Sequence, residues 1–272
     1  MKKFLVLLPV LFTALIAANS TKAQDHTSGP PLIREIIHSS ILLEERPIRI
    51  QLPRAYEQSE SQYPVLFILD AEHEEHFKWS LETTELLTAK GQIPEMIIVG
   101  IENTNRLRDM SVPVFEYEGK TVVGGAEKFL GFLEKELIPF INDKYRTSTS
   151  RILYGVSATA TFSIFTMVTQ PTVFDAYVAA SPSFFVNYDI INANARKYFA
   201  TNKDLNKVFF MNLGTEDHEK RVTQTRAFAD LIEQLAPPEF RWELRVMNGD
   251  GHVPRSSLED GLKMIFSQAT TN

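Results

Sequence analysis

The stretch LYGVSATATF, residues 153–162, decides how this chain is interpreted. A short apolar run leads into Gly155, and Ser157 follows before a series of small residues that can open a helix. A serine on a sharp turn between a buried strand and a helix projects its hydroxyl from the sheet, and the next backbone N–H can point at a developing oxyanion. The stretch therefore predicts either a nucleophile on such a turn or an ordinary polar loop residue. Residues elsewhere in the chain decide between these two interpretations of Ser157.

Apolar runs like the one before Gly155 recur along the chain. Continuous runs are typical of strands buried on both faces of a sheet. Amphipathic helical patterns lie between them, at 127–145, 224–235 and 258–266, and this alternation predicts a mostly parallel sheet with helices on both sides. Two earlier strands, joined by a turn, are expected within residues 33–53. The runs are VLFILD (65–70), MIIVGI (96–101), RILYG (151–155), AYVAAS (176–181) and KVFFMNLG (207–214), with a further strand expected at RWELRVM (241–247).

The composition is that of a globular chain without a basic field. The chain has 272 residues, 44% of them hydrophobic, and a formal net charge of -6. This length suits one sizeable domain, and the negative charge argues against nucleic acid as a partner. The chain holds no cysteine. That excludes thiol catalysis and cysteine-ligated metals, and it leaves core burial to hold the fold.

The first residues read MKKFLVLLPVLFTALIAANSTKAQ, in the order two lysines, apolar core and small residues. This order predicts a secretory signal peptide at 1–23, cleaved after Ala23. The apolar run is short for a membrane span and contains Pro9, so an uncleaved anchor is the weaker alternative. We expect a flexible leader at 24–31, one domain at 32–268, and a periplasmic or secreted mature protein without stable membrane insertion.

A serine nucleophile needs a base, and the base needs an orienting acid, in the chain order serine, acid, histidine for a sheet of this kind. His252 lies in the glycine-rich stretch NGDGHVP after the last expected strand. Asp217 and Glu216 follow the strand before it; we expect Asp217 to be the orienting acid, with Glu216 as second choice. Each residue alone also fits a solvated loop. Together, in this order and each after a different strand, they predict a catalytic triad with Ser157.

The cluster EHEEH, residues 72–76, suggests metal binding at first sight. Its histidines, His73 and His76, stand three positions apart, whereas the histidines of the zinc-protease motif H-E-x-x-H stand four apart. An acidic, solvated loop or helix start accounts for the cluster equally well. We therefore expect neither a metal nor another cofactor.

With these residues in view, the sequence resembles the α/β-hydrolase-fold esterases related to esterase D and to the periplasmic enterochelin and salmochelin esterases. The resemblance covers about residues 33–266 and implies an α/β-hydrolase fold, in which a mostly parallel central sheet is flanked by helices and preceded by antiparallel strands. It rests on VLFILDAEHEEHF (65–77), VGIENTNRLRDMSVP (99–113), GGAEKFLGFLEKELIPFINDKYRT (124–147), FDAYVAASPSFF (174–185) and GHVPRSSLEDGL (251–262).

The resemblance also implies roles for individual residues. Ser157 is the expected nucleophile, His252 the general base and then acid, and Asp217 or Glu216 the orienting acid. The implied oxyanion hole consists of the backbone amides of Ala158 and Ala71. For Arg106 and Arg108, two roles stay open: contact with an anionic or polar substrate, or support of Asp109.

The chain departs from the family at the turn around Ser157. The family has Gly-His-Ser-x-Gly-Gly, whereas this chain has Val156 in place of the histidine and Thr159 and Ala160 in place of the two glycines. We expect a serine esterase that hydrolyses a carboxylic ester or lactone of a small molecule or an acylated glycan. The altered turn keeps a second hypothesis open, a weakly active or inactive relative that binds a small molecule. The sequence predicts no oligomeric state for the protein.

Overall fold

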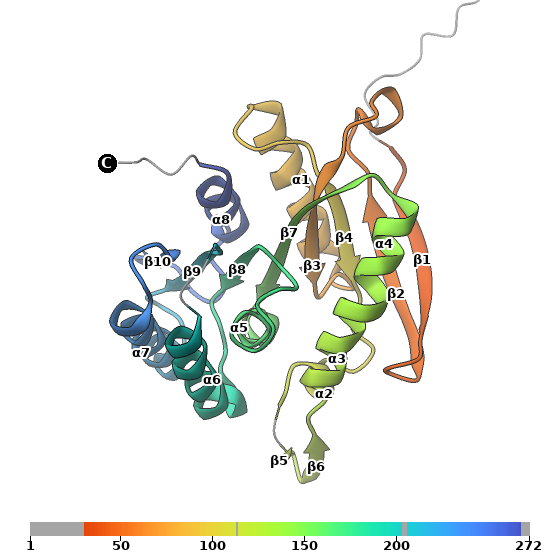
Figure 1. Ribbon diagram of the computed structural model, residues 1–272. Helices are drawn as coiled ribbons and strands as arrows, with labels where there is room; N and C mark the ends of the chain where they lie inside the picture. Colours follow the sequence, from red (N-terminus) through yellow and green to blue (C-terminus); the bar gives the residue numbers. More distant parts are fainter. Residues whose placement is uncertain (1–29, 113, 203–205, 268–272) are drawn as a thin grey trace, which may run out of the picture.

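Eight strands form the central sheet, in the order β1-β2-β4-β3-β7-β8-β9-β10 (Figure 1). The structure is a computed structural model that describes residues 30–112, 114–202 and 206–267. A two-stranded hairpin, β5–β6, stands apart from the sheet. The strands are β1 (Ile33–Ser39), β2 (Glu44–Gln51), β3 (Tyr63–Leu69), β4 (Ile97–Ile101), β5 (Val114–Tyr117), β6 (Lys120–Val123), β7 (Thr147–Val156), β8 (Ala176–Ala180), β9 (Val208–Gly214) and β10 (Arg241–Met247).

The strands from β4 to β10 in this order run parallel, and β1 and β2 run antiparallel to their neighbours. This confirms the fold expected from the sequence. In the parallel strands β3, β4 and β8, almost every residue is buried, as the continuous apolar runs predict. Because parallel strands share one carboxyl edge, the turns after β3, β7, β9 and β10 are gathered at that edge.

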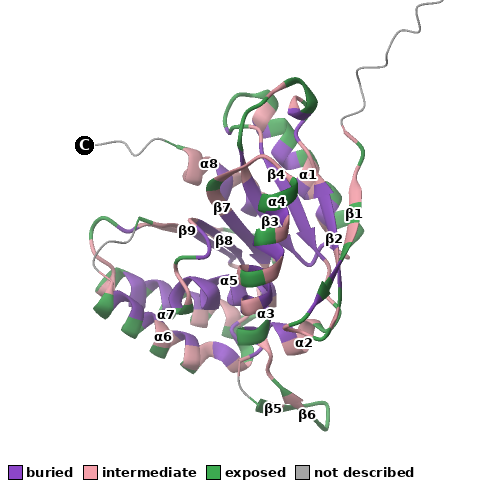
Figure 2. Cartoon of the chain, turned by 45° about the vertical axis from the view of Figure 1, so that its right-hand side comes forward, coloured by how far each residue is buried: buried purple, intermediate pink, exposed green. Residues whose placement is uncertain are grey.

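Helices cover both faces of the sheet, and buried residues fill the space between (Figure 2). One face is covered by α1 and α8, whose Phe77 and Leu258 pack in the smaller apolar cluster. Most of the other helices pack in the larger cluster, with Phe129, Phe162 and Phe228 among its members. The helices are α1 (Glu74–Ala89), α2 (Arg106–Asp109), α3 (Ala126–Phe132), η2 (Leu133–Leu137), α4 (Ile138–Lys144), α5 (Ala158–Thr169), α6 (Tyr188–Thr201), α7 (Glu219–Leu235) and α8 (Ser257–Phe266), with single turns η1 (Tyr56–Gln58) and η3 (Phe185–Asn187).

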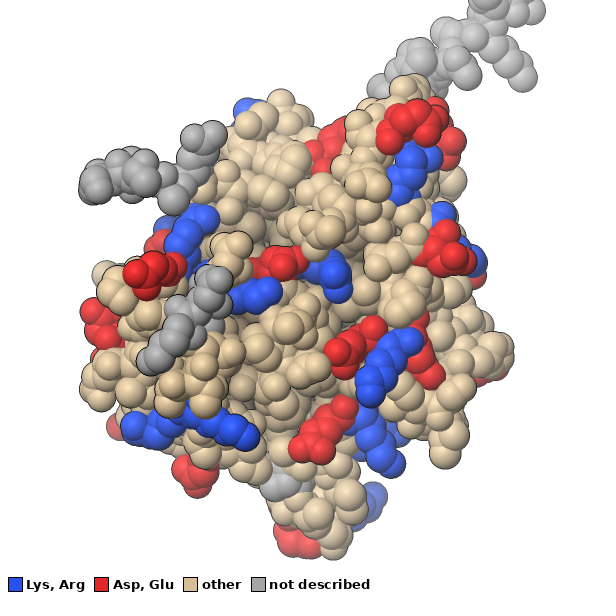
Figure 3. All heavy atoms as spheres, in the orientation of Figure 1, with Lys and Arg blue, Asp and Glu red and all other residues tan. Residues whose placement is uncertain are grey.

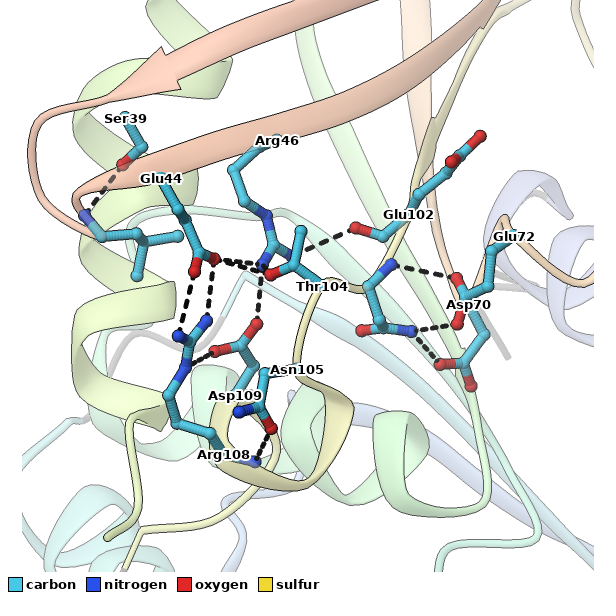
Figure 4. Close-up of polar contacts among 12 residues, drawn as sticks. Ser39, Glu44, Arg46, Asp70, Glu72, Glu102, Thr104, Asn105, Arg108 and Asp109 are labelled. Carbon is cyan, nitrogen blue, oxygen red and sulfur yellow. Dashed lines mark hydrogen bonds and ion pairs between the residues drawn. The ribbon is translucent and has the colours of Figure 1, made fainter.

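A buried ion-pair network joins the N-terminal strands to the loop after β4 (Figure 4). Arg46 of β2 is fully buried, and its Nη1 lies 2.8 Å from Asp109 Oδ2 of α2. Its guanidinium also lies over the ring of Phe129, 4.9 Å from the centroid. The Glu44 carboxylate accepts two hydrogen bonds from Arg108, at 2.8 and 3.0 Å. The network holds the α2 segment, and thereby Arg106, against the sheet.

The predicted signal peptide, 1–23, lies outside the described residues, as does the predicted leader up to residue 29. Across the ranges that the structure describes, no helix combines the length and the apolar character needed to cross a membrane. On the face drawn in Figure 3, Lys and Arg side chains lie beside Asp and Glu side chains in most places. Charges of both signs are therefore mixed over this face.

Candidate active site

Ser157 lies between β7 and α5 in a backbone conformation that few residues adopt. Its φ is 57° and its ψ is -117°, and its side chain makes no hydrogen bond that caps the helix. Its N–H instead donates to the carbonyl of Ala180, at the end of β8, over 2.9 Å. A non-glycine residue in such a conformation costs about 1–3 kcal/mol, and positions of this kind cluster at active sites. The serine therefore stands on the strained turn that its surroundings in the sequence predict.

Gly155 explains how strand and helix come so close at this turn. A Cβ added at Gly155 would lie 2.3 Å from the carbonyl oxygen of Thr159, closer than side-chain atoms can approach backbone. Glycine is needed there because the first turn of α5 passes directly over β7. Thr159 itself fits without such a clash, and it is fully buried.

His252 and Asp217 contact each other although 34 residues separate them. His252 Nδ1 lies 2.7 Å from Asp217 Oδ2, and the Asp217 side chain is 2% exposed. The other oxygen, Oδ1, accepts hydrogen bonds from Arg221 Nε at 2.8 Å and from the His218 N–H at 2.6 Å. Both oxygens of this carboxylate therefore have hydrogen-bond donors.

These donors keep Asp217 ionised. Burial raises the pKa of the carboxyl group, but the hydrogen bonds from Arg221, His252 and a backbone N–H outweigh burial and lower the pKa of Asp217 below its ordinary value. A carboxylate is an acceptor, so Nδ1 of the neutral His252 ring carries the proton and Nε2 is left as the acceptor. Glu216 is exposed, and its backbone N–H donates to Asp250. The geometry thus pairs His252 with the first of the two acids that the sequence offered.

Close backbone contacts fix the loop that holds His252. A Cβ at Gly214 would lie 2.2 Å from the carbonyl oxygens of Asp250 and Gly251, so the turn after β9 can approach this loop because residue 214 is glycine. The Val253 N–H donates to Ser181 Oγ over 3.1 Å. Ser181 directly follows Ala180, the residue that accepts the Ser157 N–H. The His252 loop and the Ser157 turn are therefore attached to neighbouring residues at the end of β8.

The two backbone amides expected to form the oxyanion hole, those of Ala71 and Ala158, differ in their hydrogen bonds. The Ala71 N–H donates to the carbonyl of Ile101 over 3.1 Å, so it is already used within the fold, and the expectation for Ala71 is not supported. The Ala158 N–H, at the start of α5, and the Glu72 N–H, in the next turn position after Ala71, have no hydrogen-bond acceptor within the described ranges. Apolar patterns do not show which backbone N–H groups of the turn after β3 are used within the fold, so they give no signal for Glu72.

Asp70, the residue before this turn, is 1% exposed and has a φ of 61°. Its Oδ1 accepts from Asn103 Nδ2 at 2.6 Å and from Arg106 Nε at 2.8 Å. Its Oδ2 accepts from Arg106 Nη2 at 2.9 Å and from Thr159 Oγ1 at 3.0 Å. In Figure 4, Asp70 and Glu72 lie side by side. A buried carboxylate with four donors thus connects the β3 turn to α2 and α5.

The two arginines of the α2 segment have different partners. Arg106 directs Nε and Nη2 to Asp70, a hydrogen-bonded pairing that raises the pKa of Arg106, and its side chain is 37% exposed. Arg108 uses Nε for Asp109 and both terminal nitrogens for Glu44. Of the two roles left open by the sequence, the geometry favours support of Asp109 for Arg108. Arg106 stays a candidate for substrate contact through Nη1.

His73 and His76 lie apart from this arrangement. His76 is largely buried against Tyr154, with ring centroids 5.5 Å apart, and burial lowers the pKa of His76. In the described part of the chain, no group of three or more His, Asp or Glu side chains has the geometry to hold a metal ion. A cavity of about 710 Å³ lies between α1 and the ends of β2 and β4, lined by Leu81 and Met96 among others. None of the side chains that surround Ser157 lines it.

Comparison with known proteins identifies relatives of this chain. The family model described as "Putative esterase" matches residues 39–253. Ferri-bacillibactin esterase BesA of Bacillus subtilis is 26% identical over 218 residues, which cover 70% of this chain and 74% of the relative. Among solved structures, an IroE-like serine hydrolase from Shewanella oneidensis has a TM-score of 0.77 and 27% identity, with 87% of this chain and 80% of that chain covered.

The BES protein from Bacillus cereus has a TM-score of 0.75 over 96% of this chain and 100% of that chain, and at 21% identity it supports the fold. The family match extends over most of the chain, from the end of β1 to the residue after His252. The chain therefore belongs to this esterase family, has the α/β-hydrolase fold, and is a carboxylic-ester hydrolase related to siderophore esterases.

Proposed function

We propose that the chain is a serine esterase that uses Ser157, His252 and Asp217 as a catalytic triad. The observation that supports this most directly is the 2.7 Å contact between His252 Nδ1 and Asp217 Oδ2, at the edge where Ser157 stands on its strained turn. Ser157 follows β7, Asp217 follows β9 and His252 follows β10, which is the chain order of a triad on an α/β-hydrolase fold. Glu216, exposed and without contact to His252, has no part in the proposal.

In the proposed reaction, the three side chains act in turn. His252 Nε2 takes the proton of the Ser157 hydroxyl as its oxygen attacks the ester carbonyl carbon, and Asp217 stabilises the imidazolium that forms. The tetrahedral intermediate collapses when its C–O bond to the leaving alcohol breaks, and His252 gives the proton to that alcohol. A water molecule, deprotonated by the same imidazole, then attacks the acyl enzyme and frees the acid and Ser157.

The negative oxygen of the tetrahedral intermediate needs donors that are in place beforehand. We assign this role to the N–H groups of Ala158 and Glu72. Ala158 begins α5, so the positive end of the helix dipole adds to its effect. The Glu72 carboxylate would oppose an oxyanion, but it accepts hydrogen bonds from the Asn103 backbone and side chain, at 3.0 and 2.8 Å, which hold it in place. The amide of Glu72 can therefore act without its side chain.

The substrate is proposed to be a small-molecule ester or lactone, with an acylated glycan as the further candidate. BesA, whose match covers 70% of this chain, is named as an esterase of ferri-bacillibactin, so a siderophore ester is the first substrate to test. Arg106, with Nη1 left over from its pairing with Asp70, is placed to contact a polar or anionic part of such a substrate. A place in the periplasm or outside the cell belongs to this proposal, on the strength of the signal-like order of residues 1–23.

A fluorophosphonate probe tests the triad. The purified full chain and its Ser157→Ala variant are incubated with the probe, and intact mass and peptide mass spectra locate the adduct. We expect one adduct, on Ser157, in the wild-type chain and none in the variant, with hydrolysis of p-nitrophenyl butyrate lost in parallel. A folded wild-type chain without an adduct on Ser157 would favour a small-molecule binding protein instead.

A further inference from the structure

We propose that Thr159 is a positioning residue for the oxyanion hole. It stands where the related esterases have a glycine of the turn around the nucleophile. Its hydroxyl joins, through Asp70, the two backbone segments that supply the proposed oxyanion donors. The inference rests on the proposed function, because it concerns how the N–H groups of Ala158 and Glu72 are held relative to each other.

The first half of the connection lies within the turn after β7. Thr159 directly follows Ala158 and is fully buried, and its Oγ1 accepts the Val156 N–H over 2.8 Å. The same oxygen lies 3.0 Å from Asp70 Oδ2 and 2.8 Å from the Val156 carbonyl. A hydroxyl has one proton, and a hydrogen bond to an ionised acceptor is stronger than one to a carbonyl. The proton therefore goes to Asp70, which anchors the Ala158 side of the site to that carboxylate.

The second half lies in the turn after β3. Asp70 has a φ of 61° and begins the turn, which is closed by the hydrogen bond from the His73 N–H to the Asp70 carbonyl, at 3.2 Å. Asn103 donates both to the Asp70 carboxylate and to the Glu72 carboxylate, so Asp70 and the residue that carries the Glu72 N–H are held by the same side chain. The Asp70 side chain is the group that Thr159 contacts. One hydrogen bond thus links the turn with the Glu72 donor to the helix with the Ala158 donor.

Arg106 and Asn103 make this link rigid. They supply three of the four hydrogen bonds to Asp70, from α2 and from the loop after β4. A buried carboxylate held by several donors from different elements has little freedom to turn, so movement at Thr159 would be transmitted to the β3 turn rather than absorbed. A glycine at position 159 would leave Asp70 Oδ2 without its partner from α5. The threonine is therefore a functional replacement and not damage to the turn.

The inference predicts a loss in turnover and not in substrate binding. In Thr159→Val the shape is kept and the hydroxyl is lost; we expect kcat for p-nitrophenyl butyrate to fall about 10- to 100-fold, because oxyanion donors act mainly in the transition state. KM should stay close to the wild-type value. Thr159→Ser keeps the hydroxyl and should restore most of kcat. If Thr159→Val does not fold, Thr159→Ala is the substitute variant.

Thr166→Val is the matched control. Thr166 lies on the same helix, is equally buried, and its hydroxyl has no hydrogen-bond partner among the described residues. Turnover is expressed per serine titrated to completion by the fluorophosphonate, which removes any difference in the folded fraction. Affinity for phenylboronic acid, whose tetrahedral adduct with serine places an oxygen in the oxyanion hole, should fall in Thr159→Val together with kcat.

The two proposals fail in different ways. Wild-type chain that gives no adduct on Ser157 would overturn the proposed function itself. Wild-type labelling on Ser157, combined with an unchanged kcat in Thr159→Val, would overturn the role of Thr159 alone. So would a Thr159→Ser variant as impaired as Thr159→Val, or a loss that appears in KM with kcat unchanged.

Discussion

Two buried aspartates of this molecule, Asp70 and Asp217, have similar surroundings and different consequences. Each has a side chain 1–2% exposed, and each is held by an arginine that is about one third exposed. Asp70 directs its remaining oxygen position to a threonine hydroxyl, whereas Asp217 directs it to a histidine. The threonine hydroxyl keeps its proton, whereas an imidazole can accept a proton and release it again. An aspartate–arginine ion pair therefore serves as a fixed connection at Asp70, whereas at Asp217 the same kind of pair supports proton transfer.

The hydrogen-bond donors to the two aspartates also come from different parts of the chain. Asp217 receives two of its partners from within four residues, Arg221 and His218, and one from the distant His252. The donors to Asp70 come from three separate parts of the chain, the loop after β4, α2 and α5. A carboxylate that joins several distant elements contributes more to folding than one that is held locally. Activity and stability are therefore expected to rank the two aspartates in opposite orders.

Asp217→Asn tests the catalytic side of this comparison and has the largest expected effect. The amide no longer holds His252 in the tautomer that leaves Nε2 free, so we expect kcat to fall about 10³- to 10⁴-fold. Steady-state hydrolysis of p-nitrophenyl butyrate measures it. Glu216→Gln, one residue away with the same change of group, is the matched control and should keep nearly wild-type kcat. A larger loss in Glu216→Gln than in Asp217→Asn would contradict the pairing.

Asp70→Asn tests the structural side. The amide removes the charge that Arg106 neutralises and replaces one acceptor by a donor, so we expect the free energy of unfolding to fall by about 2–3 kcal/mol. Asp217→Asn should cost about 1 kcal/mol, because two of its three partners lie within four residues of it and the contact joins fewer distant elements. Urea denaturation followed by circular dichroism compares the two variants. Equal costs, or a larger cost for Asp217→Asn, would show that the two pairs are not distinguished by the number of elements they join.

Arg221→Gln sharpens the comparison, since it alters Asp217 without touching the histidine. Loss of the two N–H donors should loosen the carboxylate and lower kcat about tenfold, well below the effect of Asp217→Asn. Arg226→Gln, on the same helix, is the control and should leave kcat unchanged. The measurement is kcat per titrated serine. If Arg221→Gln matched Asp217→Asn, the arginine would have to act on the reaction more directly than through the carboxylate.

The sequence predicted the sheet because its buried strands are continuous apolar runs, and β3, β4, β8 and β9 all lie where these runs lie. It also indicated the chain order of Ser157, Asp217 and His252, since each follows such a run. The helix α1 was not predicted beyond a possible start, and α6 was not predicted. The first turn of α1 is rich in charge, and its apolar face is interrupted by buried Ser80, Thr83 and Thr84. Periodicity alone does not detect a helix of this kind.

The rest of the site depends on backbone geometry that apolar patterns do not encode. The use of the Ala71 N–H by Ile101 follows from the pairing of the β3 turn with the end of β4. The fit of Thr159 follows from a carboxylate 89 positions away in the sequence, so the residue looked like a defect when judged against the family motif alone. A single sequence gives the least information about contacts between polar side chains that lie far apart along the chain.

Glu44 belongs to the ion-pair network away from Ser157. Its substitution has the smallest expected effect and tests whether the effects of the other substitutions are specific to their sites. The hydrogen bonds from Arg108, and then from Thr104 and Arg46, lower the pKa of Glu44 from 4.5 to about 2. Its contribution to stability is therefore complete above the unfolded pKa of 4.5 and is lost as the pH falls towards about 2. We expect Glu44→Gln to lower the free energy of unfolding by about 1 kcal/mol at pH 7, after allowance for solvent screening.

Urea midpoints of the wild-type chain and Glu44→Gln, measured from pH 7 down to the acid limit, check this prediction. The difference between them should be constant above about pH 4.5 and shrink below it, because both chains then carry a neutral group at this position. Turnover at pH 7 should change little, since Arg46 and Arg108 still hold Asp109 of α2 when Glu44 is replaced. A large loss of turnover in Glu44→Gln would mean that any ion pair of this fold affects catalysis through overall rigidity. The distinction between a structural role for Asp70 and a catalytic role for Asp217 would then lose its meaning.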